Sequence, residues 1–341
     1  MYIFKRRIIE KKLIERSKNT KFNLEKAESY HIKKNDGPDI NNSYYFSAHE
    51  NDLSIYCRLG IRTNQLETWF VIFYKGEKYY LNKEFFYVGK SPLWVKRSLN
   101  CWVITFDGEL LDDKGNSHIC NFKGAFSSED NVIDFSTGML PHRMAVAIAQ
   151  EKWNKDFFNN LESIQGQTHY EQNGLLEGKF TLDKKEVRFS IPCVRDHSFG
   201  KRDWNYMNNH LWVMAVSRKG QLNYSMVSYP SLTILEVGNY FEGKKLRLFK
   251  EANYDLNEIS RGKNIEKLNF VLTLDDETKL NVEAKVINTH IFHFQQGDYK
   301  LIENIASFNI NGEEYKGILE IGFNKDNKRY FNGKKPRKLK R

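Results

Sequence analysis

Short runs of aromatic and β-branched residues recur along most of this chain, and turn-forming residues separate them. Such runs favour strands, and the 24 Phe and 18 Tyr of the sequence strengthen this preference. Asn311-Gly312, between two such runs, is a strong hairpin signal. Regularly spaced short strands are typical of antiparallel sandwiches or barrels. The chain is therefore expected to be all-β, with two successive β-barrels or sandwiches that meet near Trp204.

Two helices are expected outside the strands. Apolar residues recur among Lys and Arg in residues 3–17, which predicts a short basic amphipathic helix. A helical period also follows Pro141 and continues to about Leu161, and this single prominent helix would close one end of a barrel. The expected organisation is a basic helical segment (1–34), a first β-barrel domain (35–203), a second β-barrel domain (204–327) and a basic tail (328–341).

The net charge of +10 is concentrated at the two ends. Residues 1–34 hold eleven Lys and Arg against four Glu, and residues 328–341 hold eight basic residues and no acid, which leaves the body acidic. An acidic body is a poor match to a phosphate backbone, so a nucleic-acid partner is not expected. The basic ends are either solvated or in peripheral contact with an anionic membrane. The N-terminal helix either docks on the body or lies on a membrane surface.

The cysteines indicate a reducing compartment. Cys57, Cys101, Cys120 and Cys193 are widely spaced and form no C-x-x-C pair, which is typical of free thiols. No apolar run reaches the ~20 residues of a transmembrane helix, and no signal-peptide pattern follows the basic start of the chain. A cytoplasmic location is expected, with membrane contact at most peripheral.

Polar residues gather in two clusters, His169-Tyr-Glu-Gln-Asn-Gly174 and Arg195-Asp-His-Ser-Phe-Gly-Lys-Arg-Asp-Trp204. The residues between them resemble two strands, so a hairpin would place the clusters side by side. On a strand, His169 and Glu171 would face the same way and could line a cavity together.

The clusters fit two interpretations. A carboxyl group or an imidazolium could serve as a general acid or base, with aromatic side chains stabilising a cationic intermediate. Alternatively, Arg, Asp and Trp could satisfy one another in a buried network that ties the two domains together. Neighbouring arginines are expected to lower the pKa of Asp196 and of Asp203, which favours the second interpretation.

Other histidines give weaker signals. His142 follows Pro141 at a helix start, where it either faces a pocket mouth or is solvated. His210, His290 and His293 have no nearby further ligand of clear spacing, so no metal site is predicted. Nucleophile-elbow, Walker and dinucleotide-binding motifs are missing from the sequence, which gives no reason to expect a cofactor.

The two clusters resemble the signature of an uncharacterised protein family, Tyr-Glu-Gln followed by Arg-Asp-His-Ser-Trp-Gly-x-Arg-Asp-Trp. The resemblance covers about residues 40 to 323 and includes Trp212. Phe199 stands where the family has Trp, which keeps an aromatic side chain but loses the indole N–H donor. The family is distantly similar to the hydroxyneurosporene synthase (carotenoid hydratase) and tocopherol cyclase-like group, whose fold is a pair of lipocalin-like β-barrels.

This resemblance implies a cavity in or between two barrels for an apolar isoprenoid-, lipid- or polyketide-like ligand. Members of the wider group protonate a double bond to add water or close a ring without a metal or redox cofactor, which implies hydration, cyclisation or isomerisation here. Carried onto this sequence, Asp196 is the expected acid, His197 its partner and Glu171 a further polar group of the catalytic site. The alternative is a membrane-associated carrier of a lipid-like ligand without catalysis. The expected ligand contacts are His169, Tyr170, Gln172, Arg195, Phe199, Arg202, Asp203, Trp204, Trp212 and His142.

Overall fold

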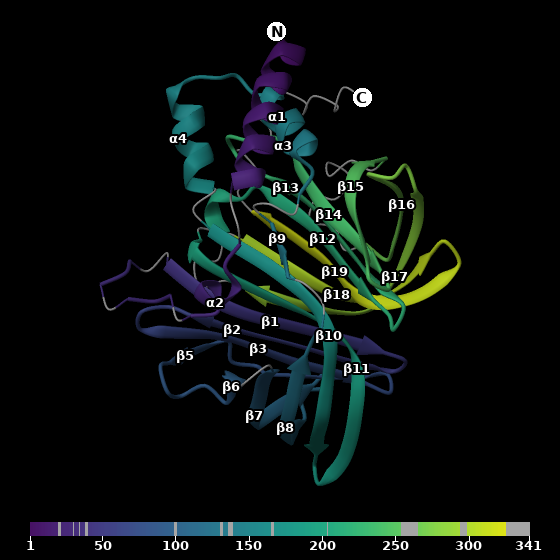
Figure 1. The fold of residues 1–341 in the computed structure, drawn as a ribbon. Coiled ribbons are helices and arrows are strands. Elements are labelled where there is room, and N and C mark those ends of the chain that lie inside the picture. Colours follow the sequence, from purple (N-terminus) through teal and green to yellow (C-terminus); the bar gives the residue numbers. More distant parts are fainter. Residues whose placement is uncertain are drawn as a thin grey trace.

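The chain folds into two antiparallel β-barrels of lipocalin-like type (Figure 1). The structure is a computed structural model, and it describes residues 1–19, 22–29, 31–33, 35–37, 40–98, 101–129, 132–135, 139–164, 167–202, 204–253, 265–293 and 299–324. The predicted all-β class and the tandem barrels are confirmed. η1 (Trp204–Tyr206) connects the two sheets. The four-part division of the chain stays a prediction, and its basic tail lies outside the described residues.

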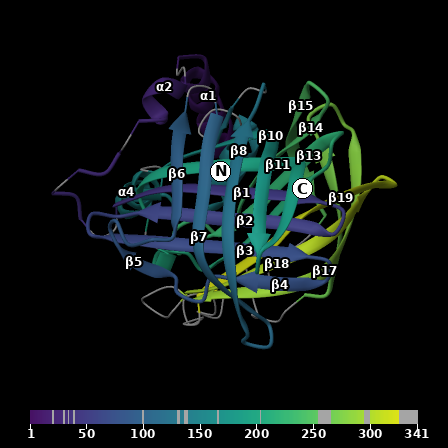
Figure 2. The ribbon, with the colours of Figure 1, turned by 90° about the horizontal axis from the view of Figure 1, so that it is seen from below.

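The first sheet closes on itself through its longest hairpin. Its pairing order is β11-β1-β2-β3-β4-β7-β8-β10, and β10 also pairs with β11. Figure 2 shows β6 to β8 crossing in front of β1 to β3, as the two walls of a flattened barrel do. Aromatic and aliphatic side chains fill the space between these walls. The strands are β1 (Ile40–Glu50), β2 (Leu53–Ile61), β3 (Gln65–Tyr74), β4 (Glu77–Tyr80), β5 (Phe85–Tyr87), β6 (Leu93–Ser98), β7 (Cys101–Asp112), β8 (Ser117–Ser127), β9 (Ile133–Asp134), β10 (Gln167–Leu182) and β11 (Lys185–Lys201).

The second sheet is a closed barrel in which each strand pairs with its neighbours in sequence. Asn311 and Gly312 have φ values of 51° and 90°, as a two-residue hairpin turn requires, so the predicted hairpin is confirmed. Apolar side chains fill this barrel too. Its strands are β12 (Asn209–Val216), β13 (Gly220–Ser228), β14 (Leu235–Glu242), β15 (Lys245–Ala252), β16 (Lys267–Leu274), β17 (Lys279–His293), β18 (Tyr299–Ile310) and β19 (Glu313–Asn324).

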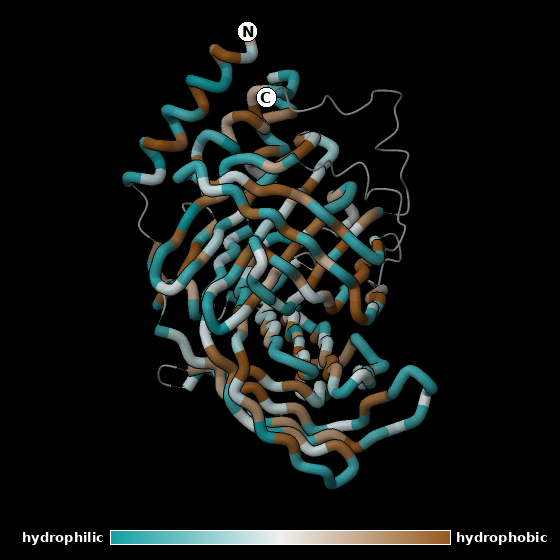
Figure 3. The backbone as a smooth tube through the Cα atoms, turned by 90° about the vertical axis from the view of Figure 1, so that its right-hand side faces the viewer, coloured by the Kyte–Doolittle hydropathy of each residue, from teal (hydrophilic) through white to brown (hydrophobic). Residues whose placement is uncertain are grey.

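The two barrels pack against each other through a third apolar cluster. Trp69 of β3 stacks on Phe292 of β17 with a ring-centroid distance of 4.1 Å. Hydrophobic and hydrophilic residues alternate along the strands, as sheets with one face toward a core require (Figure 3). Each barrel therefore has an interior that is filled by its own side chains and an outer face that contacts the other barrel.

Helices cover one end of the second barrel (Figure 1). The expected single helix after Pro141 is two helices, α3 (Pro141–Gln150) and α4 (Lys155–Ile164). The break occurs because Trp153 Nε1 donates to the Ile148 carbonyl at 2.9 Å and the Asn154 side chain accepts from the Phe157 amide at 2.8 Å, which starts a new helix.

The N-terminal helix docks on the body. α1 (Tyr2–Asn19) packs against α3, and Lys5 Nζ donates to the Glu151 carbonyl at 2.8 Å. The short α2 (Leu24–Ala27) follows and brings Glu28 to the first barrel. Within the described residues, no helix combines the length and apolar character needed to cross a membrane.

Candidate functional site

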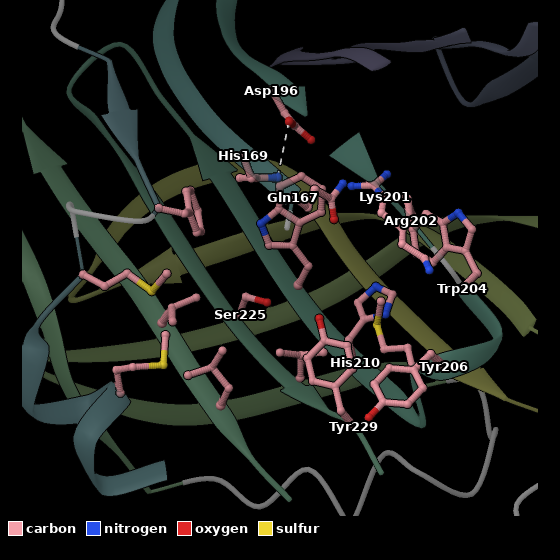
Figure 4. A pocket seen from close by; sticks show the side chains of 18 of the residues that line it. Gln167, His169, Asp196, Lys201, Arg202, Trp204, Tyr206, His210, Ser225 and Tyr229 are labelled. Atoms are coloured by element: carbon pink, nitrogen blue, oxygen red, sulfur yellow. Dashed lines mark ion pairs between the residues drawn. The ribbon is translucent and has the colours of Figure 1, made fainter. Parts of the chain in front are cut away.

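A cavity of about 590 Å³ lies between the two barrels (Figure 4). Residues of α1, α3 and α4 also contribute to its wall. A cavity of this volume suits a small organic molecule. Much of the wall is aromatic or aliphatic, including Trp204, Trp212, Tyr229, Met139, Met144 and Leu235. Polar and charged side chains also line the cavity, and they come from both barrels: Arg58, Gln167, His169 and Asp196 from the first, and His210, Ser225 and Glu320 from the second.

The hairpin of β10 and β11 brings the two polar clusters together. Its register pairs Glu171 with Asp196 and Tyr170 with His197. The prediction that a hairpin would place the clusters side by side is therefore confirmed. Because side chains alternate along a strand, the two cross-strand pairs face opposite sides of the sheet.

His169 lies between two carboxyl groups at the cavity wall. Its Nδ1 lies 3.5 Å from Asp196 Oδ1 (Figure 4). Its Nε2 lies 3.1 Å from Glu171 Oε1. The exposed side-chain fractions are 23% for His169, 9% for Asp196 and 1% for Glu171. His169 and Asp196 border the cavity, whereas Glu171 lies behind His169.

The second barrel holds Glu171 in place. Asn223 of β13 donates its side-chain amide to Glu171 Oε2, and Trp212 of β12 donates its indole N–H to Asn223 Oδ1 at 2.8 Å. Trp212 itself forms part of the cavity wall. The position of Glu171 therefore depends on residues of both barrels.

The three ionisable groups retain protons to higher pH than usual. Burial raises the pKa of Glu171 and of Asp196, and the nearby cations His169 and Arg202 only partly oppose this effect on Asp196. The expectation that neighbouring arginine would lower the pKa of Asp196 is wrong, because burial dominates. Burial also disfavours the His169 imidazolium, but Asp196 and Glu171 outweigh it, so the net pKa of His169 is raised. Groups of this kind are suited to donating a proton to a ligand.

His197 faces the interior of the first barrel. Its Nδ1 lies 2.5 Å from the Tyr170 hydroxyl, and its Nε2 lies 2.7 Å from Asn42 Oδ1. Burial and then the nearby Arg195 lower the pKa of His197 well below its usual value, which keeps the ring neutral. The expected pairing of Asp196 with His197 is therefore wrong in its geometry. Neighbouring residues of a strand point in opposite directions, and the imidazole beside Asp196 is that of His169.

Arg195 anchors a buried polar network inside the same barrel. Its Nη2 lies 2.8 Å from Glu28 Oε1 and donates to Gln172 Oε1 at 2.9 Å. Tyr170 also donates to Glu28, at 3.0 Å. Phe199 stacks on His31 with a centroid distance of 3.5 Å. These contacts tie the segment after α1 to the first barrel, and none of these residues lies in the cavity wall.

The other expected contact residues divide in the same way. Arg202, Trp204 and Trp212 line the cavity, and the Arg202 guanidinium lies 4.8 Å from the Trp204 ring centroid. His142 is not in the wall; its Nδ1 lies 3.2 Å from Glu10 Oε1 of α1. Asp203 lies outside the described residues.

Several polar residues of the wall were not predicted from the sequence as part of the site. His210 and Glu320 of the second barrel bond to each other, and His210 Nδ1 lies 2.5 Å from the Tyr299 hydroxyl. Glu320 is also the cross-strand neighbour of the fully buried Glu303, whose pKa burial raises. The available signal was a charged residue inside an apolar strand, as in Ile318-Leu-Glu-Ile321.

In the described part of the chain, no group of three or more His, Cys, Asp or Glu side chains is arranged to hold a metal ion. His290, considered above as a ligand, packs against the rings of Tyr80 and Phe292 at centroid distances of 4.8 and 4.5 Å.

A family model described as "Domain of unknown function (DUF7064)" matches residues 25–325. The chain belongs to this family. The match spans both barrels and the hairpin that carries the polar clusters, so the expected membership of an uncharacterised family is supported at this level. The specific signature, and the distant likeness of the DUF7064 chain to the hydratase and cyclase group, remain predictions.

Comparison with curated proteins gives no match. Among solved structures, the DUF7064 chain is similar to "a putative AttH" from Nitrosomonas europaea, with a TM-score of 0.57 and 8% identity over 84% of this chain and 92% of that one. It is also similar to kievitone hydratase from Nectria haematococca, with a TM-score of 0.47 and 10% identity over 86% and 92% of the two chains. The first similarity extends over both barrels and supports the fold alone.

Proposed function

We propose that this DUF7064 chain binds an apolar small molecule between its barrels and adds a proton to it. The observation that carries the proposal is the His169–Asp196 pair at the wall of a largely apolar cavity. An acid must hold its proton at the working pH and release it to the ligand. Burial favours the protonated form of Asp196, and the cavity gives a ligand access to it.

In the proposed reaction, Asp196 transfers its proton to one carbon of an electron-rich double bond. The positive charge that develops on the other carbon would be stabilised by the faces of Trp204 and Trp212. Water then adds to that carbon and returns a proton to the Asp196 carboxylate, which completes a hydration. Loss of a proton from a neighbouring carbon would instead give an isomer, and attack by a second double bond would close a ring.

His169 and Glu171 would position and tune the acid. A charged imidazolium can donate through both ring nitrogens, so His169 can hold Asp196 on one side and Glu171 on the other. Glu171 is fixed from behind by Asn223 and does not need to move during the reaction. Neither group requires a metal or redox cofactor for this role.

A carrier without catalysis is the second candidate, and a feature of α1 favours it. Ile3 and Phe4 are 57% and 67% exposed beside basic residues, and Leu13 of the same helix lines the cavity. Such a helix could contact an anionic membrane and pass a lipid-like ligand to the cavity.

Native mass spectrometry of the purified protein, followed by analysis of its organic extract, tests the shared part of both proposals. We expect one apolar molecule per chain. Incubating the extracted molecule with fresh protein distinguishes the enzyme from the carrier. An enzyme changes the mass or the retention time of the molecule, whereas a carrier leaves the molecule unchanged. If both the purified protein and protein soaked in a cell lipid extract contain no bound molecule, the binding proposal is wrong.

A further inference from the structure

Two arginines border the cavity next to Asp196: Arg58 is buried and Arg202 is half-buried. Arg58 of β2 has a side-chain exposure of 4% and lies with its guanidinium 4.8 Å from the Trp69 ring centroid. Arg202 is arranged in the same way on Trp204 (Figure 4). All four side chains belong to the cavity wall. A guanidinium stacked on an aromatic face keeps its in-plane N–H groups available for acceptors.

The backbone of β2 makes room for Arg58. A Cβ added to Gly60 would lie 2.8 Å from Arg58 Nη1 and 3.1 Å from Nη2. Any side chain at position 60 would therefore push the guanidinium away from its present place. The glycine keeps this charged group at the cavity wall.

The two arginines carry two positive charges, and among the described residues only one carboxylate forms an ion pair with either of them. Glu67 Oε2 lies 2.7 Å from Arg58 Nη1, and Glu67 is itself almost fully buried. Arg58 Nη2 has no hydrogen-bond partner among the described residues. Arg202 donates to Ser198 Oγ at 3.0 Å, and the Gln167 amide, turned with its oxygen toward Arg202, accepts from Nε and Nη2 at 2.8 Å each. These last partners are neutral.

Asp196 does not pair directly with either arginine. Among the described residues its ion-pair partner is His169, and burial raises its pKa. Burial and the proximity of Arg58 together lower the pKa of Arg202 to about 10, as expected for two cations held close to each other away from water. A buried cation of this kind is strongly stabilised by an anion of good geometry.

We propose that Arg58 and Arg202 form a subsite for an acidic oxygen of the ligand, either a carboxylate or an ionised enol or phenol. The ligand is then an amphipathic acid rather than a pure hydrocarbon. Its apolar body contacts the aromatic wall, and its anionic end lies near Asp196. This inference rests on the proposed function. An anion there would also keep Asp196 protonated, because a nearby negative charge disfavours a carboxylate.

The experiment compares two probes that differ in charge, decanoate and 1-decanol, by titration of the full-length protein with calorimetry or tryptophan fluorescence. We expect the wild type to bind decanoate on the order of tenfold or more tightly, since a charge-assisted hydrogen bond contributes at least about 1.4 kcal/mol. Arg202→Gln should remove this preference and leave the affinity for decanol unchanged. Arg58→Gln combined with Glu67→Gln, which avoids a lone buried carboxylate, should do the same.

Arg218→Gln is the matched control, because Arg218 is an exposed arginine that bonds to Glu50 outside the cavity. It should keep the wild-type preference. Equal binding of the two probes by the wild type, or a preference that survives in both cavity variants, overturns the subsite and leaves the apolar cavity standing. If neither probe binds, the apolar cavity and the subsite are both wrong.

Discussion

Asn223 of the second barrel donates a hydrogen bond to Glu171 of the first, directly behind His169. This hydrogen bond is one of a chain of polar contacts that begins at the Trp212 indole, passes through His169 and ends at Asp196. The proposed acid is therefore positioned by residues of both barrels. A substitution in the second barrel can therefore alter the position of the proposed proton donor without contacting it directly.

Asp196→Asn should abolish proton transfer while the cavity remains. The amide has nearly the shape of the acid but no acidic proton, so we expect conversion of the extracted ligand to fall about 10²- to 10⁴-fold. Ligand affinity should change little. Asp183→Asn is the control, because Asp183 is 54% exposed and bonds to His118 outside the cavity. Full turnover in the Asp196 variant would show that another group is the acid.

His169 should titrate above its ordinary pKa, because Asp196 and Glu171 outweigh the effect of burial. Its folded pKa then exceeds the unfolded value of about 6.5. The stabilisation is fully present below pH 6.5 and is lost as the pH rises through the folded pKa. Nuclear magnetic resonance of the ring nitrogens should show the raised pKa, and Glu171→Gln should lower it. The difference in unfolding free energy between wild type and His169→Asn should shrink at high pH; a constant difference contradicts the shift.

Arg195 should matter for stability rather than for turnover. Its guanidinium is 1% exposed and pairs with the buried Glu28. Arg195→Met leaves that carboxylate unpaired, so we expect a loss of about 3–5 kcal/mol in chemical denaturation. Adding Glu28→Gln should recover part of this loss. Arg188→Gln, at a side chain 77% exposed, should cost less than about 1 kcal/mol. A stable but inactive Arg195→Met variant would assign Arg195 to the reaction.

Ile3 and Phe4 should carry membrane contact if the basic helix α1 meets a lipid surface. Because both side chains are exposed, we expect the double variant Ile3→Glu and Phe4→Glu to keep the fold. Flotation with phosphatidylcholine vesicles containing phosphatidylserine should show binding by the wild type and loss in this variant. Trp94→Glu, at a residue 53% exposed on the first barrel, is the control. Equal flotation of wild type and α1 variant would rule out this contact.

The strands and the central hairpin could be predicted from sequence because both are local patterns. Period-two alternation and turn residues such as Asn311-Gly312 determine where strands begin and pair. The same alternation separates Asp196 from His197 and could have been applied to that pair as it was to His169 and Glu171. This alternation of side chains does not show which part of a barrel's outer surface contacts the other barrel.

The cavity residues and their charge states were harder to predict, because they depend on how the barrels pack. Arg58 belongs to the first barrel and His210 and Glu320 to the second, so they line one cavity only because the two barrels pack together. The raised pKa of Asp196 follows from its burial between the barrels, whereas the sequence shows only that it lies next to Arg195 and His197. The local sequence shows the neighbours of a residue along the chain, whereas tertiary packing determines how far the residue is exposed to solvent.

Because side chains fill the interior of each barrel, the proposed ligand site lies in the contact between them. Ligand occupancy and barrel docking are then thermodynamically linked, since a molecule that binds only the docked form stabilises it. Each barrel also contributes its own part of the wall. Chimeras that exchange one barrel between family members should therefore alter all of that barrel's proposed ligand contacts at once, so that ligand selectivity can change by recombination as well as by point substitution.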